Sequence, residues 1–172
     1  MNEKMEILLS REKIEQRVVG LAEEISHDFV NSHLLLICVL KGAVIFVSDL
    51  MRQLKIPVEI DFMAVSSYGA DTSSSGIVRI LKDLEQGIQD RDVLIVEDII
   101  DTGLTLSYLR DNLASRQPRS LKVVTLLDKP SRRKVAFEPD YCGFAIPDSF
   151  VVGYGLDFNE QYRYLADICV LS

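Results

Sequence analysis

Carboxylates and a small, hydroxyl-bearing turn follow one another closely in residues 93–105, which read VLIVEDIIDTGLT. The apolar residues 93–96 predict a buried strand of the kind found in parallel sheets, after which the chain presents Glu97 and Asp98. Two apolar residues and Asp101 come next, and a predicted helix begins after the turn. A strand that ends in such a turn and opens a helix surrounds an anion with N–H groups and hydroxyls.

The residue types in the turn favour a phosphate group as the anion. Thr102 and Thr105 offer hydroxyls, and Gly103 lets the backbone come close to a ligand. The spacing GxxxxGK[ST] of a P-loop and the GxGxxG fingerprint of dinucleotide-binding folds are both missing from this segment. We therefore predict a 5′-phosphate site of another kind.

Carboxylates beside a phosphate are unfavourable unless they bind hydroxyl groups or a metal ion. A ribose ring supplies two hydroxyls at a suitable distance from its 5′-phosphate, so Glu97 and Asp98 are candidate acceptors for them, with Mg²⁺ between the sugar and a pyrophosphate. Acids at the start of a helix also interact favourably with its dipole, which is the alternative explanation for Asp101 alone. The whole segment favours a phosphoribosyl-pyrophosphate site.

The elements around this segment predict an α/β fold. Residues 11–30 carry an apolar helical stripe with Ser10 as N-cap, and residues 43–54 and 104–113 also favour helices. Residues 66–76 are small and polar and predict a long loop of the kind that often closes over a site. Strands are expected at residues 34–40, 58–65, 77–81, 92–96, 121–127, 141–146, 150–152 and 168–171.

Length and charge limit the classes of function. The 172 residues fit one domain, with a net charge of −7 and 48% hydrophobic residues. An acidic chain without a run of Lys or Arg is a poor match for nucleic acid or an anionic membrane surface. Neither a signal peptide nor a membrane span is expected, and Cys38, Cys142 and Cys169 are expected as buried free thiols. These features predict a cytoplasmic protein.

The sequence resembles the type I phosphoribosyltransferases, and among them the hypoxanthine-guanine family, over nearly the whole chain. The matching motifs are Leu40-Lys41-Gly42, Ser67-Tyr68, EDIIDTG at residues 97–103, Lys129 in LLDKPSRR, and FVVGYGLD at residues 150–157 followed by Arg163. The resemblance implies a central parallel sheet flanked by helices, within a single domain of residues 1–172. It places the core at about residues 30–130 and a small hood in the N-terminal segment and about residues 131–172.

The resemblance also implies roles at the sugar end of the site. Thr102, Gly103, Leu104 and Thr105 are expected to hold the 5′-phosphate, although many family members have Lys or Arg where Leu104 stands here. Lys41, Gly42 and Arg163 are expected at the pyrophosphate, with a non-proline cis peptide joining Lys41 to Gly42. Mg²⁺ is the expected cofactor, and its expected ligands are Glu97, Asp98 and Asp157.

At the purine end, the resemblance implies that Lys129 donates to O6 of a 6-oxopurine, that Phe150 stacks on the base and that Val151 and Asp157 line it. Asp101 is the expected general base and acid at N7 of the purine. The Ser67-Tyr68 loop is expected to close over the reacting sugar and exclude water. The implied assembly is a homodimer or homotetramer.

The predicted reaction is therefore transfer of phosphoribose to hypoxanthine or guanine, as in purine salvage. Alternatives are an enzyme for another base, a regulator of the same fold that binds phosphoribosyl pyrophosphate, and a homologue without activity. His27 and His33 match no motif and are expected to be structural. Arg132 and Arg133 are expected to be surface charges.

Overall fold

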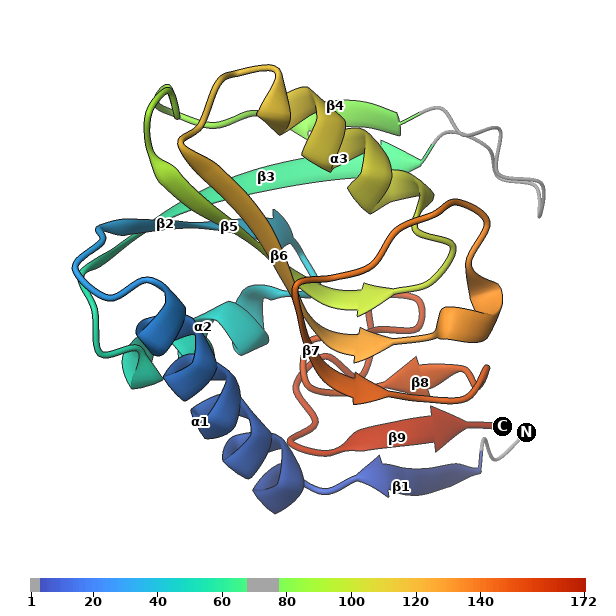
Figure 1. Cartoon of the computed structure of the whole chain (residues 1–172). Helices are drawn as coiled ribbons and strands as arrows, with labels where there is room; N and C mark the ends of the chain where they lie inside the picture. The colour runs from blue at the N-terminus through green and yellow to red at the C-terminus, as the bar shows by residue number, and fades with distance from the viewer. Residues whose placement is uncertain (1–3, 68–77) are drawn as a thin grey trace.

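The computed structural model describes residues 4–67 and 78–172 and is built around a six-stranded sheet (Figure 1). The strand order is β4-β3-β2-β5-β6-β7, and all neighbours are parallel except β3 and β4. The apolar run LLLICVL forms β2 (Leu34–Leu40), in which six of the seven residues are buried because both faces of the sheet are covered. The other strands are β3 (Val58–Ser67), β4 (Val78–Lys82), β5 (Asp92–Ile100), β6 (Ser120–Asp128) and β7 (Tyr141–Ala145).

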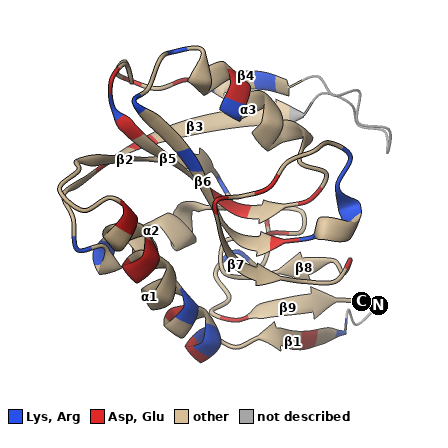
Figure 2. Cartoon of the chain, viewed as in Figure 1, with Lys and Arg blue, Asp and Glu red and all other residues tan. Residues whose placement is uncertain are grey.

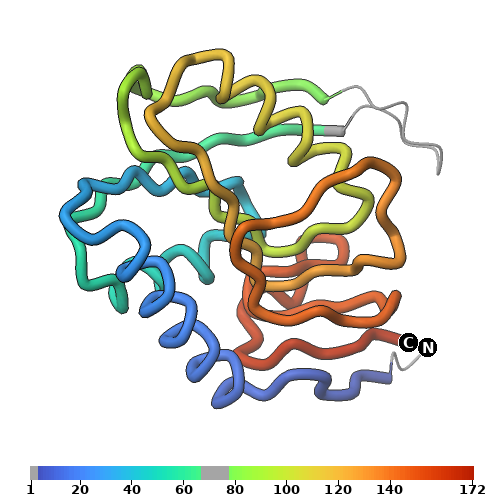
Figure 3. The backbone as a smooth tube through the Cα atoms, in the orientation of Figure 1, coloured from blue at the N-terminus to red at the C-terminus, as the bar shows by residue number. Residues whose placement is uncertain are grey.

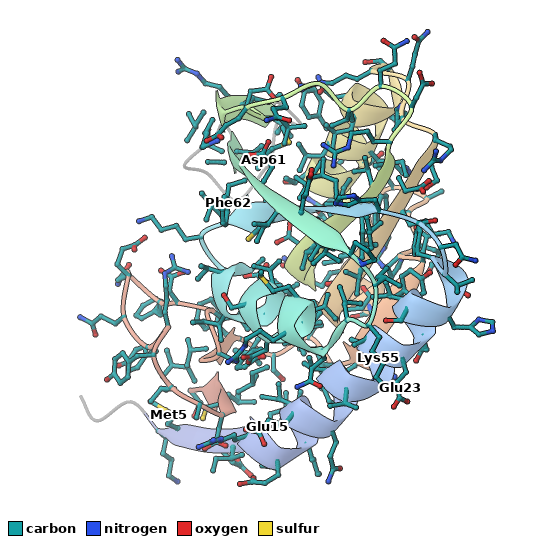
Figure 4. All side chains as sticks on the ribbon, turned by 90° about the vertical axis from the view of Figure 1, so that its left-hand side faces the viewer. Met5, Glu15, Glu23, Lys55, Asp61 and Phe62 are labelled. Atoms are coloured by element: carbon teal, nitrogen blue, oxygen red, sulfur yellow. The ribbon has the colours of Figure 1, made fainter. Side chains whose placement is uncertain are left out.

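Helices cover the two faces of this sheet and enclose separate apolar clusters. The helices α1 (Arg11–Asp28) and α2 (Val44–Gln53) lie on one face, and α3 (Leu104–Ala114) lies on the other (Figure 1). The predicted stripe of α1 is buried, and the Ser10 hydroxyl accepts from the Lys13 N–H at 3.4 Å, so the predicted N-cap is confirmed. The polar face of α1 points outward, as Glu15 and Glu23 show in the side view of Figure 4.

A second, three-stranded sheet forms the hood and joins the two ends of the described chain. It contains β1 (Met5–Leu9), β9 (Ile168–Leu171) and β8 (Val151–Val152), with β9 in the middle and both pairings antiparallel. Lys4 and Ser172 exchange backbone hydrogen bonds of 2.9 and 3.0 Å, so the first and last described residues lie side by side (Figure 3). This small sheet is thus built from segments at both ends of the described chain.

Several predicted boundaries differ from the structure. The strand expected to stop at residue 96 continues as β5 to Ile100, because its pairing with β6 continues through Glu97 and Ile99 to Ile100. The residues 141–145 were expected in the hood, whereas β7 is the sixth strand of the core sheet, parallel to β6. Ser66 and Ser67, which were expected in a loop, belong to β3, and the rest of that expected loop lies outside the described residues.

Charged residues gather where the parallel strands end. Figure 2 shows acidic residues at the carboxyl ends of β5 and β6 and a basic segment just after β6, which includes the short 3₁₀ helix η1 (Pro130–Arg132). In parallel α/β sheets, this edge is where ligands bind. Within residues 4–67 and 78–172, no helix is both long and apolar enough to cross a membrane.

Candidate active site

The carboxyl end of β5 carries the two acids predicted to bind ribose. Glu97 is 8% exposed, and its Oε1 accepts from the backbone N–H of Asp98 at 3.0 Å. Burial, together with the neighbouring charge of Asp98, raises the pKa of Glu97 well above its usual value. The two carboxyl groups therefore share less negative charge than a pair of free carboxylates would carry at the same pH.

The turn after β5 opens into a cavity of about 230 Å³. Gly103 has φ +82° and caps α3, and the backbone N–H of Leu104 donates to the Thr102 hydroxyl at 3.3 Å. A glycine at this φ avoids the strain that other residues have in the left-handed region. The lining residues include most of the predicted phosphoribosyl motif: Glu97, Asp98, Asp101, Gly103 and Thr105.

Gly42 lies directly against the acids of β5. A Cβ at this position would come within 1.8 Å of Asp98 Oδ2, and a Cβ at Gly155 would come within 2.2 Å of the Gly42 carbonyl oxygen. The turn that contains Gly42 is therefore enclosed between β5 and the loop around residue 155. The non-proline cis peptide lies one bond earlier than expected, between Leu40 and Lys41 rather than between Lys41 and Gly42.

Lys41 and Arg163, the two cations among the predicted pyrophosphate ligands, contact the same carboxylate. Glu160 accepts from Lys41 Nζ at 3.1 Å and from Arg163 Nη2 at 3.3 Å. Asp157 also pairs with Arg163, at 3.2 Å, and accepts from the Glu160 N–H at 2.8 Å. The hydrogen bond from Lys41 is the main reason that the pKa of Glu160 is lowered.

Asp101 is connected to Lys129 through two further charged residues. Arg132 Nε donates to Asp101 Oδ1 at 2.9 Å, and Arg132 Nη1 lies 3.7 Å from Asp148 Oδ2. The other oxygen of Asp148 lies 3.9 Å from Nζ of Lys129, which is 7% exposed. The expected surface charge Arg132 is thus part of an ion chain that joins the predicted proton carrier to the predicted O6 donor.

Arg133 is not a surface charge, because the turn before α3 packs against it. Its side chain is 12% exposed and forms a 2.8 Å ion pair with Asp128. It also donates to the Asp101 carbonyl at 3.0 Å, and a Cβ at Gly103 would come within 2.9 Å of its Cδ. The segment after β6 therefore supports the cavity wall from outside.

The base-site candidates lie on and beside the hood. Val151 is 6% exposed in β8, and Phe150 just before it is 52% exposed. The Phe150 ring meets Phe158 edge to face, with centroids 5.6 Å apart and an interplanar angle of 85°. One face of an aromatic ring is thereby held beside the loop that carries Asp157, in a position where a planar ligand can reach it.

The carboxylates of the site suit Mg²⁺ only if substrate phosphates supply further oxygen ligands. Asp98 and Asp157 lie on the two segments that enclose the turn at Gly42. Within the described parts of the chain, no three acid, His or Cys side chains converge as a metal site. Mg²⁺ usually keeps several waters and takes one or two carboxylates plus substrate phosphates, so these acids fit it in that mode.

The remaining predictions concern residues away from the cavity. Tyr68 lies outside the described residues, and Ser67 is the last residue of β3. His33 pairs with Glu59 at 3.6 Å and His27 with Asp28 at 3.5 Å, and neither histidine lines the cavity. Cys38, Cys142 and Cys169 are free thiols, and burial raises the pKa of Cys38 to about 12.

The structure thus places the predicted residues in contact groups. The phosphoribosyl motif lines one cavity with Gly42 against it, the predicted pyrophosphate cations meet at Glu160, and Lys129 is joined to Asp101. Four residues that connect these groups could not be found from sequence patterns, because the fold brings each one to a partner on another segment: Arg132, Arg133, Asp148 and Glu160.

Comparisons with known proteins identify the family of this chain. The family described as phosphoribosyl transferase domain matches residues 4–159. A hypoxanthine-guanine phosphoribosyltransferase of Mycobacterium tuberculosis is 56% identical over 96% of this chain and 85% of that protein. The enzyme of the same name from Bacillus subtilis is 51% identical, over 96% and 92%.

The fold shows the same relationship. A crystal structure of a hypoxanthine-guanine phosphoribosyltransferase from Bacillus anthracis superposes with a TM-score of 0.94 at 46% identity, over 97% of this chain and 98% of that one. The type I fold predicted from the sequence is therefore confirmed. By its sequence and its fold, this chain belongs to the phosphoribosyltransferase family and, within it, to the hypoxanthine-guanine phosphoribosyltransferases.

Proposed function

We propose that this enzyme transfers the 5-phosphoribosyl group of phosphoribosyl pyrophosphate to hypoxanthine or guanine, forming IMP or GMP and pyrophosphate. The observation that carries the proposal is the cavity at the end of β5, where acids and the cap of α3 line one space. An anion at the cap and hydroxyls beside the acids match a ribose 5-phosphate. The related enzymes from M. tuberculosis and B. subtilis are named for this reaction.

The sugar is proposed to lie across the cavity. The turn of Thr102, Gly103, Leu104 and Thr105 would hold the 5′-phosphate with backbone N–H groups and hydroxyls. Leu104 offers only its backbone, so no charged side chain at position 104 contributes to the phosphate site. Glu97 and Asp98 would accept from the 2′- and 3′-hydroxyls and stabilise the positive charge that develops on the ribose.

Pyrophosphate is proposed to bind on the other side of the turn at Gly42. Lys41 and Arg163 supply cations there, and a guanidinium matches phosphate oxygens well. The acids Asp157, Asp98 and Glu97 would hold Mg²⁺ through oxygen or water, and the ion would neutralise charge on the leaving group. The expulsion of pyrophosphate is then favoured electrostatically.

The purine is proposed to stack on Phe150 with its edge against Val151 and Asp157, and Lys129 would donate to O6. Because Lys129 is buried, a base with an amino group at this position would leave its charge poorly paired. Asp101 would take or give the proton at N7, since it lines the cavity and is held by Arg132. The contact of Lys129 with O6 would select 6-oxopurines over adenine.

One assay tests the function: purified protein is incubated with Mg²⁺, phosphoribosyl pyrophosphate and each purine, and nucleotide formation is followed. We expect IMP and GMP and very little AMP. If no nucleotide forms with any 6-oxopurine, the proposal is wrong.

Asp101→Asn tests the proton carrier. The amide keeps the size of the side chain but cannot take the proton, so kcat should fall by about 10²–10⁴-fold with little change in KM. Asp111→Asn makes the same change on the exposed part of α3 and should leave kcat unaltered. Equal kcat in Asp101→Asn and the native enzyme would exclude Asp101 from the role.

The regulator is not favoured, because the similar proteins are named as enzymes. Closure of the Ser67-Tyr68 loop over the sugar, a cytoplasmic location and a homodimeric or homotetrameric assembly stay predictions from the sequence.

A further inference from the structure

One carboxylate forms ion pairs with both cations of the proposed pyrophosphate site. Glu160 Oε2 accepts from Lys41 and Oε1 accepts from Arg163, at 3.1 and 3.3 Å. These are charge-assisted contacts of the type that phosphate oxygens make with the same groups. A pyrophosphate that reaches Lys41 and Arg163 therefore has to replace this carboxylate.

The contacts of Glu160 are easy to replace. The side chains of Glu160 and Lys41 are 65% and 66% exposed, and exposed ion pairs contribute little stability. Pyrophosphate brings more charge and more oxygen atoms than one carboxylate. Replacement is then favourable for the ligand, but the ligand loses part of its binding free energy in breaking the internal pairs.

The surrounding loop does not depend on the Glu160 side chain. The backbone N–H of Glu160 donates to Asp157 at 2.8 Å, and Arg163 keeps its bonds to Asp157 and to the Gly155 carbonyl, at 3.2 and 2.7 Å. Gly155 in turn contacts the turn at Gly42. Arg163 thus retains other anchors when the carboxylate leaves, so the carboxylate acts mainly as a competitor.

We propose that Glu160 is an internal competitor for pyrophosphate, which sets the affinity for the pyrophosphate group of the substrate and promotes release of the product. This inference rests on the proposed function, which places pyrophosphate at Lys41 and Arg163. The role differs from that of the other site residues, because removing the carboxylate strengthens binding.

The test is Glu160→Gln, which keeps the shape and removes the charge. Isothermal titration with pyrophosphate at a fixed Mg²⁺ concentration should show binding that is about three- to tenfold tighter than in the native protein. The KM for phosphoribosyl pyrophosphate should fall, and inhibition by pyrophosphate should become stronger by a similar factor. A simple loss of structure would weaken binding instead.

Glu23→Gln is the matched control. It removes one negative charge from the exposed face of α1, on the opposite side of the view in Figure 4 from the hood segments. Its pyrophosphate affinity should equal that of the native protein. An equal gain in Glu23→Gln would assign the effect to overall charge and overturn the proposal, as would unchanged or weaker binding in Glu160→Gln.

A second comparison separates this inference from the proposed function. In a Lys41→Met background, Glu160→Gln should give a smaller gain, since one of the two contested cations is gone. A gain of full size there would overturn competition at Lys41. Absence of nucleotide formation by the native protein would remove the proposed function, while the pyrophosphate titrations would still report on Glu160.

Discussion

At the scale of single residues, the buried Lys129 and the carboxylate Asp101 are parts of one ion chain. Lys129 is 7% exposed, and the carboxylate paired with its ammonium group is Asp148, 3.9 Å away. A buried cation with one distant partner gains more from a new acceptor than an exposed lysine does. The O6 atom of a purine is such an acceptor.

Lys129→Met tests this at the base. Methionine has a similar length and no charge, so kcat/KM for hypoxanthine should fall by about 10–100-fold, the effect of one charged hydrogen bond. The preference for hypoxanthine over adenine should shrink. Lys134→Met, in the exposed segment nearby, serves as the control. An unchanged preference in Lys129→Met would contradict the assignment.

The consecutive residues of the candidate site could be proposed from the sequence, and the connecting residues could not. Glu97, Asp98 and Asp101 could be assigned because strand, acids and turn follow one another along the chain. Asp148 and Glu160 act on partners 19 and 119 residues away, and loop conformation decides which partners they meet. A local sequence pattern does not predict such long-range contacts.

At the scale of elements, the turn from β2 to α2 has to fit under β5. Gly42 provides the space, since Asp98 Oδ2 stands where its Cβ would be. Both strands are rigid parts of the core sheet, so neither can yield without moving an acid of the site. The turn and the acids therefore form one unit.

Gly42→Ala tests this unit. The new methyl group displaces Asp98, and a displacement of about 1 Å at reacting groups can lower the rate about 10²-fold. We expect such a loss in kcat/KM and a lower melting temperature. A Cβ at Gly87 would have no neighbour within 4 Å, so Gly87→Ala should leave both quantities near native values. Equal activities of the two variants would show that Asp98 adapts.

The apolar runs predicted most elements correctly, because burial on both faces leaves a continuous signal in sequence. The end of β5 was missed for a physical reason: Glu97, Ile99 and Ile100 pair with β6 although acids interrupt the apolar run. Backbone pairing is set by the neighbouring strand and does not require an apolar side chain. Polar functional residues at the end of a strand therefore make its last residue hard to predict from the sequence.

At the scale of the whole molecule, acid should weaken the fold through Asp92 at the start of β5. Hydrogen bonds from Arg119 are the main reason that the pKa of Asp92 is lowered to about 2, from 3.8. A carboxylate with a lowered pKa stabilises the folded chain above its unfolded pKa, and this contribution is lost as the pH falls toward about 2. Asp92 thus links the start of β5 to the segment before β6.

Arg119→Gln should lower the free energy of unfolding at pH 7, because Asp92 loses its ion pair. The difference from the native protein should narrow as the pH falls from about 4 to about 2, where protonation of Asp92 weakens the native pair as well. Urea unfolding at several pH values measures both effects. A constant difference from pH 7 to pH 2 would argue against this linkage.

The hood affects the order in which elements can pair while the chain is being synthesised. The strand β1 is synthesised early, yet its hydrogen-bonding partner β9 comes about 160 residues later. The same β9 also holds β8, which carries Val151. On the ribosome, α1 and the core sheet can begin to pack while β1 is still unpaired, and the hood sheet is completed only when β9 emerges. The hood sheet is thus completed only after β5, which carries Glu97 and Asp98.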